Sequence, residues 1–205
     1  MSGMKSIDLL EVLQILSEKL STKYAALAAI GVTTGCRISE MLSLKRADLV
    51  DPFGNIKEHV KFVKLKARDE NASRTLLIPP DFQSYIIEHL EAEAQKGYEL
   101  GSDLVFRGQG NLPLKRQAVY ATFRRALGKG YGTHWMRKTF AQEIYKYFLN
   151  ENPNDSLRAL DLTRQALGHR HIDTTIKYLG LEYERIDNAQ KSIFNIRRIC
   201  RDAKL

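Results

Sequence analysis

Two arginines, two histidines and a tyrosine in this sequence could together cut and rejoin a phosphodiester. They are Arg37, His134, Arg137, His169 and Tyr178. A tyrosine has a pKa of about 10, and a cationic pocket favours its nucleophilic phenolate. Its attack on DNA would give a phosphotyrosine ester that keeps the energy of the broken bond. The strand could then be resealed without a nucleotide or a metal, while the arginines neutralise the nonbridging oxygens in the transition state.

The first arginine lies in TGCRISEMLSL, residues 34–44. Gly35 allows a sharp turn, and Glu40 follows Arg37 by three residues, close enough to orient the guanidinium. An arginine held in this way is preorganised for a bidentate contact with phosphate. Taken alone, however, the stretch is better explained as a surface arginine–glutamate pair.

The second arginine lies in GKGYGTHWMRKTFA, residues 128–141. Thr133 is the expected N-cap of a helix, which places His134 and Arg137 on one face of its first turn. A basic first turn is unfavourable beside the positive end of a helix dipole, and a bound anion would relieve it. A solvated basic surface explains the stretch about equally well.

The tyrosine lies in LGHRHIDTTIKYLG, residues 167–180. In one continuous helix, His169 and Tyr178 would be about 13 Å apart along the axis. Gly168 is expected instead to end one helix and Asp173 to cap the next, so that the turn between them folds His169 back towards Tyr178. The alternative for this stretch alone is a half-buried structural tyrosine.

A leaving 5′-oxygen needs a proton, and residues 56–78 offer two lysines for this task. HVKFVKLK alternates apolar and basic residues, ARDENAS is a polar turn and RTLLIP returns, which predicts a β-hairpin. Lys64 and Lys66 lie on one face of the strand, and Lys66 is preferred as the general acid because it is closer to the turn. The alternative is an exposed, merely polar face.

Helical periodicity dominates the rest of the chain. The first segment, residues 6–20, repeats apolar side chains at Leu9, Val12, Leu13, Leu16 and Leu20. Further helices are expected at 22–32, from Arg37, and at 81–96, 115–127, 133–148, 157–167, 174–179 and 182–201. The sequence therefore predicts a mostly α fold with one small antiparallel β-hairpin (α+β), forming a single domain over residues 1–205.

The composition favours a polyanionic partner. Lys and Arg number 32 against 24 Asp and Glu, a net charge of +8. The two cysteines form no metal-binding spacing, and no window approaches the roughly 20 apolar residues of a membrane span. We expect a cytoplasmic protein without metal or cofactor whose basic residues contact DNA. These are Lys64 in the hairpin and, between the hairpin and the second motif, Lys115, Arg116, Arg124 and Arg125.

The three motifs together resemble the catalytic domain of the tyrosine recombinases, the phage integrase family. The resemblance covers Thr34 to Gly180 and implies that Tyr178 is the nucleophile, with a pocket of Arg37, Lys66, His134, Arg137 and His169. It also implies site-specific recombination of double-stranded DNA on the nucleoid: integration, excision, inversion or resolution. A type IB topoisomerase, a catalytically silent DNA-binding regulator and a chance combination of motifs are the alternatives.

Two departures from the family pattern stand out. Lys138 follows the second arginine where relatives often have histidine. The resemblance also leads us to expect a catalytic segment without the N-terminal core-binding domain that most relatives carry. The chain would then be a stand-alone recombinase, as the fimbrial invertases are, or a piece of a longer protein. With fewer phosphates neutralised, DNA binding is expected to be weak and strongly salt-dependent.

The tail, residues 179–205, carries an apolar stripe of Ile186, Ile193, Phe194 and Ile196. Packing on its own domain is one interpretation. The resemblance implies another: exchange of the tail helix between subunits of a tetramer on paired sites, with accessory DNA-bending proteins as further partners.

Overall fold

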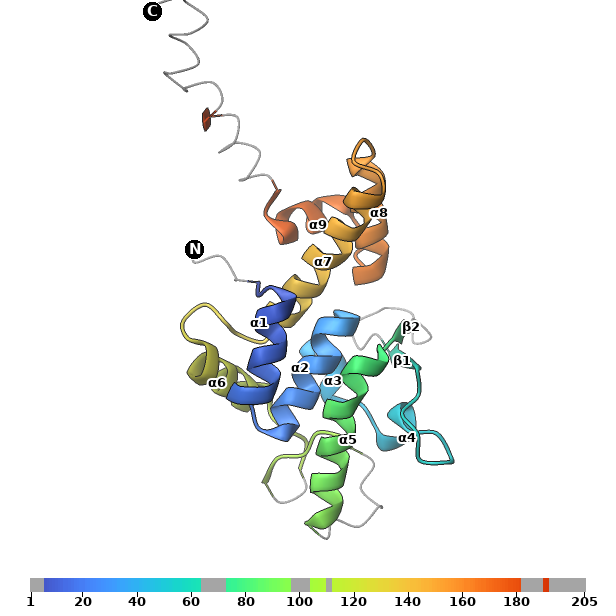
Figure 1. The fold of residues 1–205 in the computed structure, drawn as a ribbon, viewed down its shortest axis with the longest axis vertical. Helices are drawn as coiled ribbons and strands as arrows, with labels where there is room; N and C mark the ends of the chain where they lie inside the picture. The colour runs from blue at the N-terminus through green and yellow to red at the C-terminus, as the bar shows by residue number, and fades with distance from the viewer. Residues whose placement is uncertain (1–5, 64–72, 97–103, 110–111, 182–189, 192–205) are drawn as a thin grey trace, which may run out of the picture. The chain divides into compact units, whose positions relative to one another are not determined.

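A computed structural model describes residues 6–63, 73–96, 104–109, 112–181 and 190–191 (Figure 1). Within these residues it confirms a mostly helical fold with one two-stranded antiparallel sheet. The chain divides into two compact units, Met1–Glu143 and Ile144–Leu205. The prediction of a single domain stays a prediction, and the predicted hairpin turn and tail helix lie outside the described residues.

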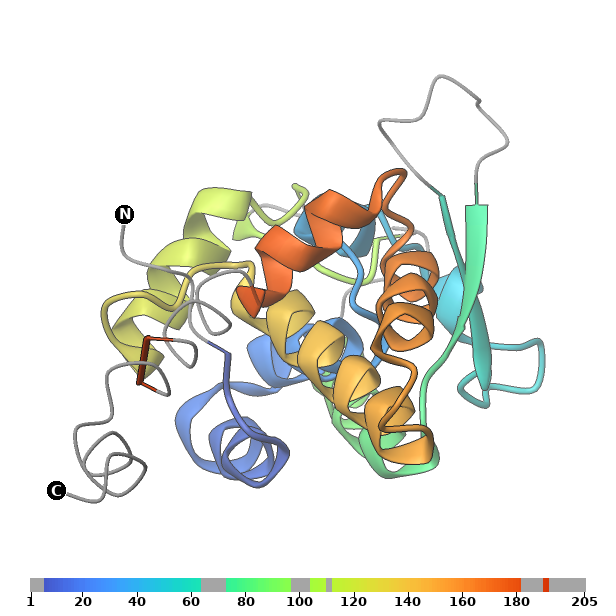
Figure 2. The same cartoon turned by 90° about the horizontal axis from the view of Figure 1, so that it is seen from above.

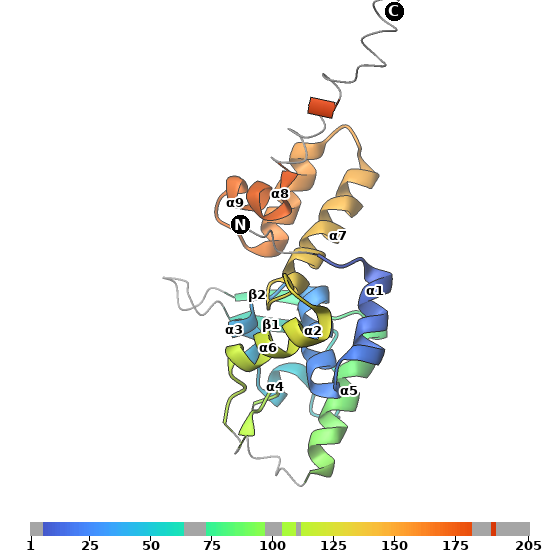
Figure 3. The ribbon, with the colours of Figure 1, turned by 90° about the vertical axis from the view of Figure 1, so that its left-hand side faces the viewer.

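The centre of the first unit is α2 (Thr22–Thr34), whose residues from Ala25 to Ile30 are almost completely buried. Helix α5 (Pro80–Gln95) packs along it, as Figure 3 shows. A Cβ on Gly31 would lie 2.6 Å from the sulfur of Met136, so the missing side chain lets helix α7 (Trp135–Glu151) approach α2 closely. Small residues in α2 therefore fix where the chain that follows His134 lies.

The N-terminal segment forms α1 (Leu9–Gln14) and then a π-helical turn, η1 (Ile15–Lys19). Val12 and Leu16 are buried as predicted, whereas Leu9 and Leu13 are 42% and 40% exposed. The π-helical turn widens the helix, so its periodicity departs from the one assumed for residues 6–20. Ile15, absent from the predicted stripe, is buried instead.

The hairpin pairs β1 (His59–Val63) with β2 (Ser73–Leu77), side by side in Figure 2. Phe62 is opposite Arg74, and Val60 is opposite Leu76. Val60 and Phe62 are buried, so these two pairs share the inner face of the sheet. Two short helices, α3 (Ile38–Leu42) and α4 (Arg46–Leu49), precede the hairpin and pack on β1.

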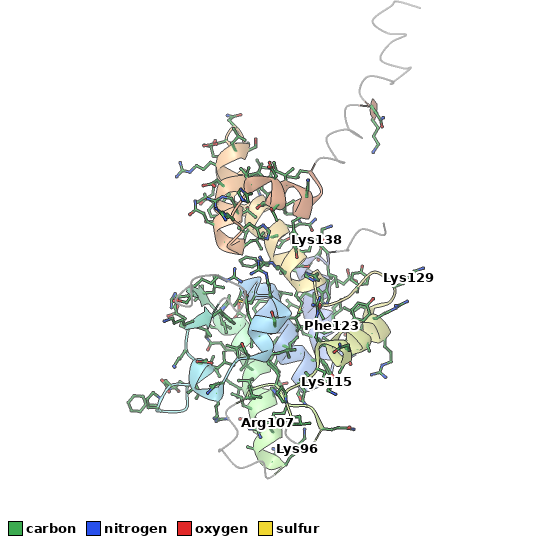
Figure 4. All side chains as sticks on the ribbon, turned by 180° about the vertical axis from the view of Figure 1, so that it is seen from behind. Lys96, Arg107, Lys115, Phe123, Lys129 and Lys138 are labelled. Atoms are coloured by element: carbon green, nitrogen blue, oxygen red, sulfur yellow. The ribbon has the colours of Figure 1, made fainter. Side chains whose placement is uncertain are left out.

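Helix α6 (Arg116–Leu127) buries Val119 and Phe123. The rings of Phe123 and Trp135 meet edge to face, with their centroids 5.7 Å apart. Figure 4 shows Phe123 on α6 between Lys115 and Lys129, which lie just outside its two ends. Helix α7 begins at Trp135, later than the predicted start at Thr133. The His134 carbonyl already accepts the backbone N–H of Lys138, so His134 immediately precedes the helix.

In the second unit, α8 (Ser156–Leu167) packs on α9 (Ile172–Leu179). Gly168 ends α8 in the left-handed conformation, which confirms the predicted C-cap. Asp173 was expected to cap the next helix, and this prediction was wrong. Helix α9 begins one residue before Asp173, after His171, so Asp173 lies inside its first turn.

A buried histidine gives the fold a pH dependence. His89 on α5 is completely buried, its Nε2 lies 3.0 Å from the Val105 carbonyl oxygen, and its ring stacks on Phe106. Burial lowers the pKa of His89 below its ordinary 6.5, more than the carbonyl and Glu93 raise it. In the unfolded chain the histidine takes a proton near pH 6.5, and in the native protein it does so only at lower pH.

Stability should therefore fall as the pH drops below about 6.5, by up to about 1.4 kcal/mol per pH unit from this residue. Urea unfolding near pH 7.5 and near pH 5.5 measures the loss. We expect a smaller loss in His89→Gln and an unchanged one in His59→Gln, since the side chain of His59 is 59% exposed. An equal loss in all three proteins would contradict the assignment.

Candidate functional site

Arg37 and Glu40 form a fixed pair at the start of α3. The backbone N–H of Arg37 donates to Glu40 Oε2 at 2.9 Å, and Arg37 Nη1 donates to Oε1 at 3.1 Å. The Glu40 side chain is only 2% exposed, whereas that of Arg37 is 41% exposed. The guanidinium is thus anchored from behind by a buried carboxylate and keeps a face open to a ligand. The predicted contact is present, and its orienting role stays a prediction.

The Glu40 carboxylate is held ionised. Burial alone would raise its pKa, but the Arg37 N–H and the guanidiniums of Arg74 and Arg37 more than offset burial and lower it below its ordinary value. A charged carboxylate is what an ion pair with Arg37 requires.

The turn at Gly35 connects the two predicted arginines. Gly35 ends α2 with φ +60°, and a Cβ there would lie 2.3 Å from a ring carbon of Phe140. Its carbonyl accepts a hydrogen bond from Nη1 of Arg137, which is buried. Arg37 thus follows this turn directly, and Arg137 is bound to it.

His134 lies among guanidinium groups. It is half-buried, and its pKa is lowered first by burial and then by the charges of Arg116, Arg137 and Arg37. A neutral imidazole near pH 7 is therefore expected, surrounded by cations. The first unit thus brings Arg37, His134 and Arg137 together and adds Arg116, which the sequence suggested only as a DNA contact.

A surface cavity of about 280 Å³ adjoins this cluster. Its lining comes from α6 and the loop before α7: Arg116, Tyr120, Arg124, Lys129, Gly130, Gly132, Thr133 and His134. Four of the five predicted DNA contacts, Lys115, Arg116, Arg124 and Arg125, are exposed, and the fifth, Lys64, lies outside the described residues. Figure 4 shows Lys115 and Lys129 at opposite ends of α6. The cavity therefore offers cationic side chains next to His134.

In the second unit, His169 and Tyr178 meet edge to face, with ring centroids 5.7 Å apart and planes at 78°. His169 Nδ1 lies 3.1 Å from Oγ1 of the buried Thr175, and the His169 carbonyl accepts from Arg164 Nη1 at 3.1 Å. The turn after Gly168 therefore folds His169 back onto α9, as predicted. Tyr178 is half-buried on that helix.

Arg74 on β2 is a site residue that the sequence did not reveal. Its Nη2 donates to Glu40 Oε2 at 3.0 Å and lies 3.4 Å from Cys36 Sγ. The only available signal was an arginine on the same strand face as Leu76 in RTLL, where an inward cation needs a partner. That partner, Glu40, is 34 residues earlier and could not be named from the sequence.

Lys64 and Lys66, the candidate general acids, lie outside the described residues, as does the apolar stripe of the tail. Among the described residues, no group of three histidine, cysteine or acidic side chains could hold a metal ion. In the same ranges, no helix is both long and apolar enough to cross a membrane.

Comparisons with known proteins identify the family of the chain. The model of the phage integrase family matches residues 4–185. Tyrosine recombinase XerH of Helicobacter pylori is 25% identical over 193 residues, which cover 91% of this chain and 48% of that protein. The chain therefore spans about half the length of this relative.

Solved structures share the fold at lower identity. XerA recombinase gives a TM-score of 0.64 at 17% identity, covering 94% of this chain and 66% of that one. XerH bound to a palindromic difH substrate, a post-cleavage complex, gives a TM-score of 0.62 at 21% identity. The match covers 92% of this chain and 53% of the XerH chain. At these identities the likeness shows the fold alone.

Proposed function

Because this chain belongs to the phage integrase family, we propose that it is a site-specific DNA recombinase acting through a covalent 3′-phosphotyrosine intermediate. The observation that carries the proposal is the cluster of Arg37, His134 and Arg137 around the Gly35 turn. A fixed guanidinium with an exposed face, as on Arg37, suits a phosphate whose charge grows in the transition state.

The proposed reaction is an in-line displacement at phosphorus. The Tyr178 oxygen attacks, the bond from phosphorus to the 5′-oxygen breaks, and Lys66 gives that oxygen its proton. His134, expected to be neutral near pH 7, accepts the phenolic proton, and His169 orients the tyrosine ring. In rejoining, a 5′-hydroxyl of the partner strand attacks the phosphotyrosine and releases Tyr178, so no nucleotide is consumed.

The proposal requires double-stranded DNA as the partner. A tetramer on paired sites, tail exchange between its subunits and accessory DNA-bending proteins belong to the same proposal, as does a location on the nucleoid. XerH, the relative named above, was solved with a difH DNA substrate.

The test uses nicked duplexes from the DNA flanking the gene and a supercoiled plasmid carrying two copies of the best substrate. We expect a protein–DNA adduct on a denaturing gel and exchanged plasmid products. An adduct with site-independent relaxation and no exchange would indicate topoisomerase IB-like activity. DNA binding without an adduct on any substrate would indicate a silent regulator and overturn the proposal.

The exposed cations of α6 and of the loop that follows it should contribute measurably to DNA affinity. Removing one cation that neutralises a phosphate should reduce the slope of log K against log salt by about 0.9. We therefore expect Arg124→Gln and Lys129→Gln, at the cavity beside His134, each to flatten the slope by about one. Fluorescence anisotropy at several salt concentrations measures it.

Lys96→Gln is the matched control, because Lys96 is ion-paired with Glu93 on α5 and does not line the cavity. Lys96→Gln could reduce the salt slope as much as the other two substitutions do. That result would mean that the net charge of the protein, and not a binding surface at the cavity, sets the slope.

A further inference from the structure

We propose that Arg74 is a positioning residue, which fixes the Glu40 carboxylate and through it the guanidinium of Arg37. The inference rests on the proposed function, in which Arg37 binds the reacting phosphate. It concerns a side chain of β2 that bonds Glu40 and is not among the residues proposed to contact the reacting phosphate.

The contacts divide the Glu40 carboxylate between two arginines. Oε1 accepts from Arg37 Nη1 at 3.1 Å, while Oε2 accepts from the Arg37 backbone N–H at 2.9 Å and from Arg74 Nη2 at 3.0 Å. Side-chain exposure rises from 2% for Glu40 and 11% for Arg74 to 41% for Arg37. Arg74 is therefore the inner cation, and Arg37 is the outer one.

This order matters for charge. A buried carboxylate needs a cation to offset its desolvation. If Arg37 alone supplied it, the pair would be neutral, and a phosphate would compete with Glu40 for the only guanidinium. With Arg74 present, two cations share one anion, so the triad keeps a net positive charge at its exposed end. Arg37 can then bind phosphate while Glu40 stays compensated.

Arg74 is itself held in two ways. The register of the hairpin places it opposite the buried Phe62, on the inner face of the sheet. Its Nη2 also lies 3.4 Å from Sγ of Cys36, the residue directly before Arg37. Burial raises the pKa of Cys36 to about 11, so the sulfur is an uncharged thiol. Arg74 thus contacts the chain on both sides of Arg37.

The test compares Arg74→Gln and Arg74→Lys with the wild type. Lys61→Gln is the matched control: Lys61 is an exposed cation on the neighbouring strand, paired with Thr75. Rates of adduct formation on nicked DNA are measured between about pH 5.5 and about pH 8.5, with DNA affinity alongside. Thermal melting shows that each variant is folded.

Without Arg74, burial should raise the pKa of Glu40, so Glu40 takes a proton at higher pH and releases Arg37. We expect Arg74→Gln to lose about tenfold or more of the rate near pH 6 and to recover much of it near pH 8.5. Arg74→Lys, which keeps the positive charge, should retain most of the rate at both pH values. Lys61→Gln should show the wild-type profile.

An equal loss of rate at all pH values in Arg74→Gln would overturn the proposal. So would the same change of the pH–rate profile in Lys61→Gln. Titration of the Glu40 carboxyl by ¹³C NMR in the free protein gives a second readout that needs no reaction. If the wild type forms no adduct, the proposed function fails. The NMR titration then still decides whether Arg74 fixes Glu40, because an unchanged Glu40 titration in Arg74→Gln would refute that.

Discussion

Replacing Tyr178 by phenylalanine is expected to abolish the covalent protein–DNA adduct and leave DNA affinity nearly unchanged. The substitution removes one oxygen and keeps the ring, which is half-buried on α9 and in edge-to-face contact with His169 at 5.7 Å. Loss of a nucleophile typically costs a factor on the order of 10⁴ or more in rate. The measurement is adduct formation on a nicked duplex in a denaturing gel, with affinity measured by anisotropy.

Tyr147→Phe is the matched control in the same unit. Tyr147 is exposed on α7, and its hydroxyl donates to Glu151 at 2.9 Å. The control should form the adduct at the wild-type rate. An adduct that persists in Tyr178→Phe would mean that another side chain is the nucleophile. Loss of DNA binding in Tyr178→Phe would mean that the tyrosine is structural.

The parts of the site that the sequence could predict are those that depend on short spacings. The Arg37–Glu40 contact follows from three residues within one helical turn, and the return of His169 towards Tyr178 follows from a glycine that ends α8. Such features are set by local backbone geometry, which one sequence carries. The order of helices and the single hairpin are equally local patterns.

The parts that could not be predicted depend on contacts between distant segments. Arg74 and Glu40, which form an ion pair, are 34 residues apart in the sequence. Arg137 and Gly35, whose carbonyl it binds, are 102 residues apart. The electrostatic effect of Arg116 on His134 likewise arises only after α6 and α7 have packed. Helix starts were misjudged where a competing residue took the N-cap: His171, not Asp173, precedes α9.

Of the substitutions proposed, Gly35→Ala is expected to lower the free energy of unfolding most. The residue has φ +60°, which costs about 1 kcal/mol for a side chain, and the new Cβ would lie 2.3 Å from the Phe140 ring. Overpacking of a dense core adds typically 1–3 kcal/mol, so we expect the unfolding free energy to fall by about 2–4 kcal/mol. Urea denaturation measures the change. Adduct formation should also slow, because Arg137 is bound to the Gly35 carbonyl.

Two further variants separate the causes of this loss. Gly54→Ala, in the same unit, has φ +92° and no atom within 4 Å of the added carbon, so it should show only the backbone cost of about 1 kcal/mol. Phe140→Leu in the Gly35→Ala background should relieve part of the clash and restore part of the lost unfolding free energy. The effects of the two substitutions would then be non-additive in a double-mutant cycle. If Gly35→Ala costs no more than Gly54→Ala, Phe140 can move aside. Gly35 would then be required for its backbone conformation alone, and the close packing of Phe140 on this turn would not be what keeps Arg137 in place.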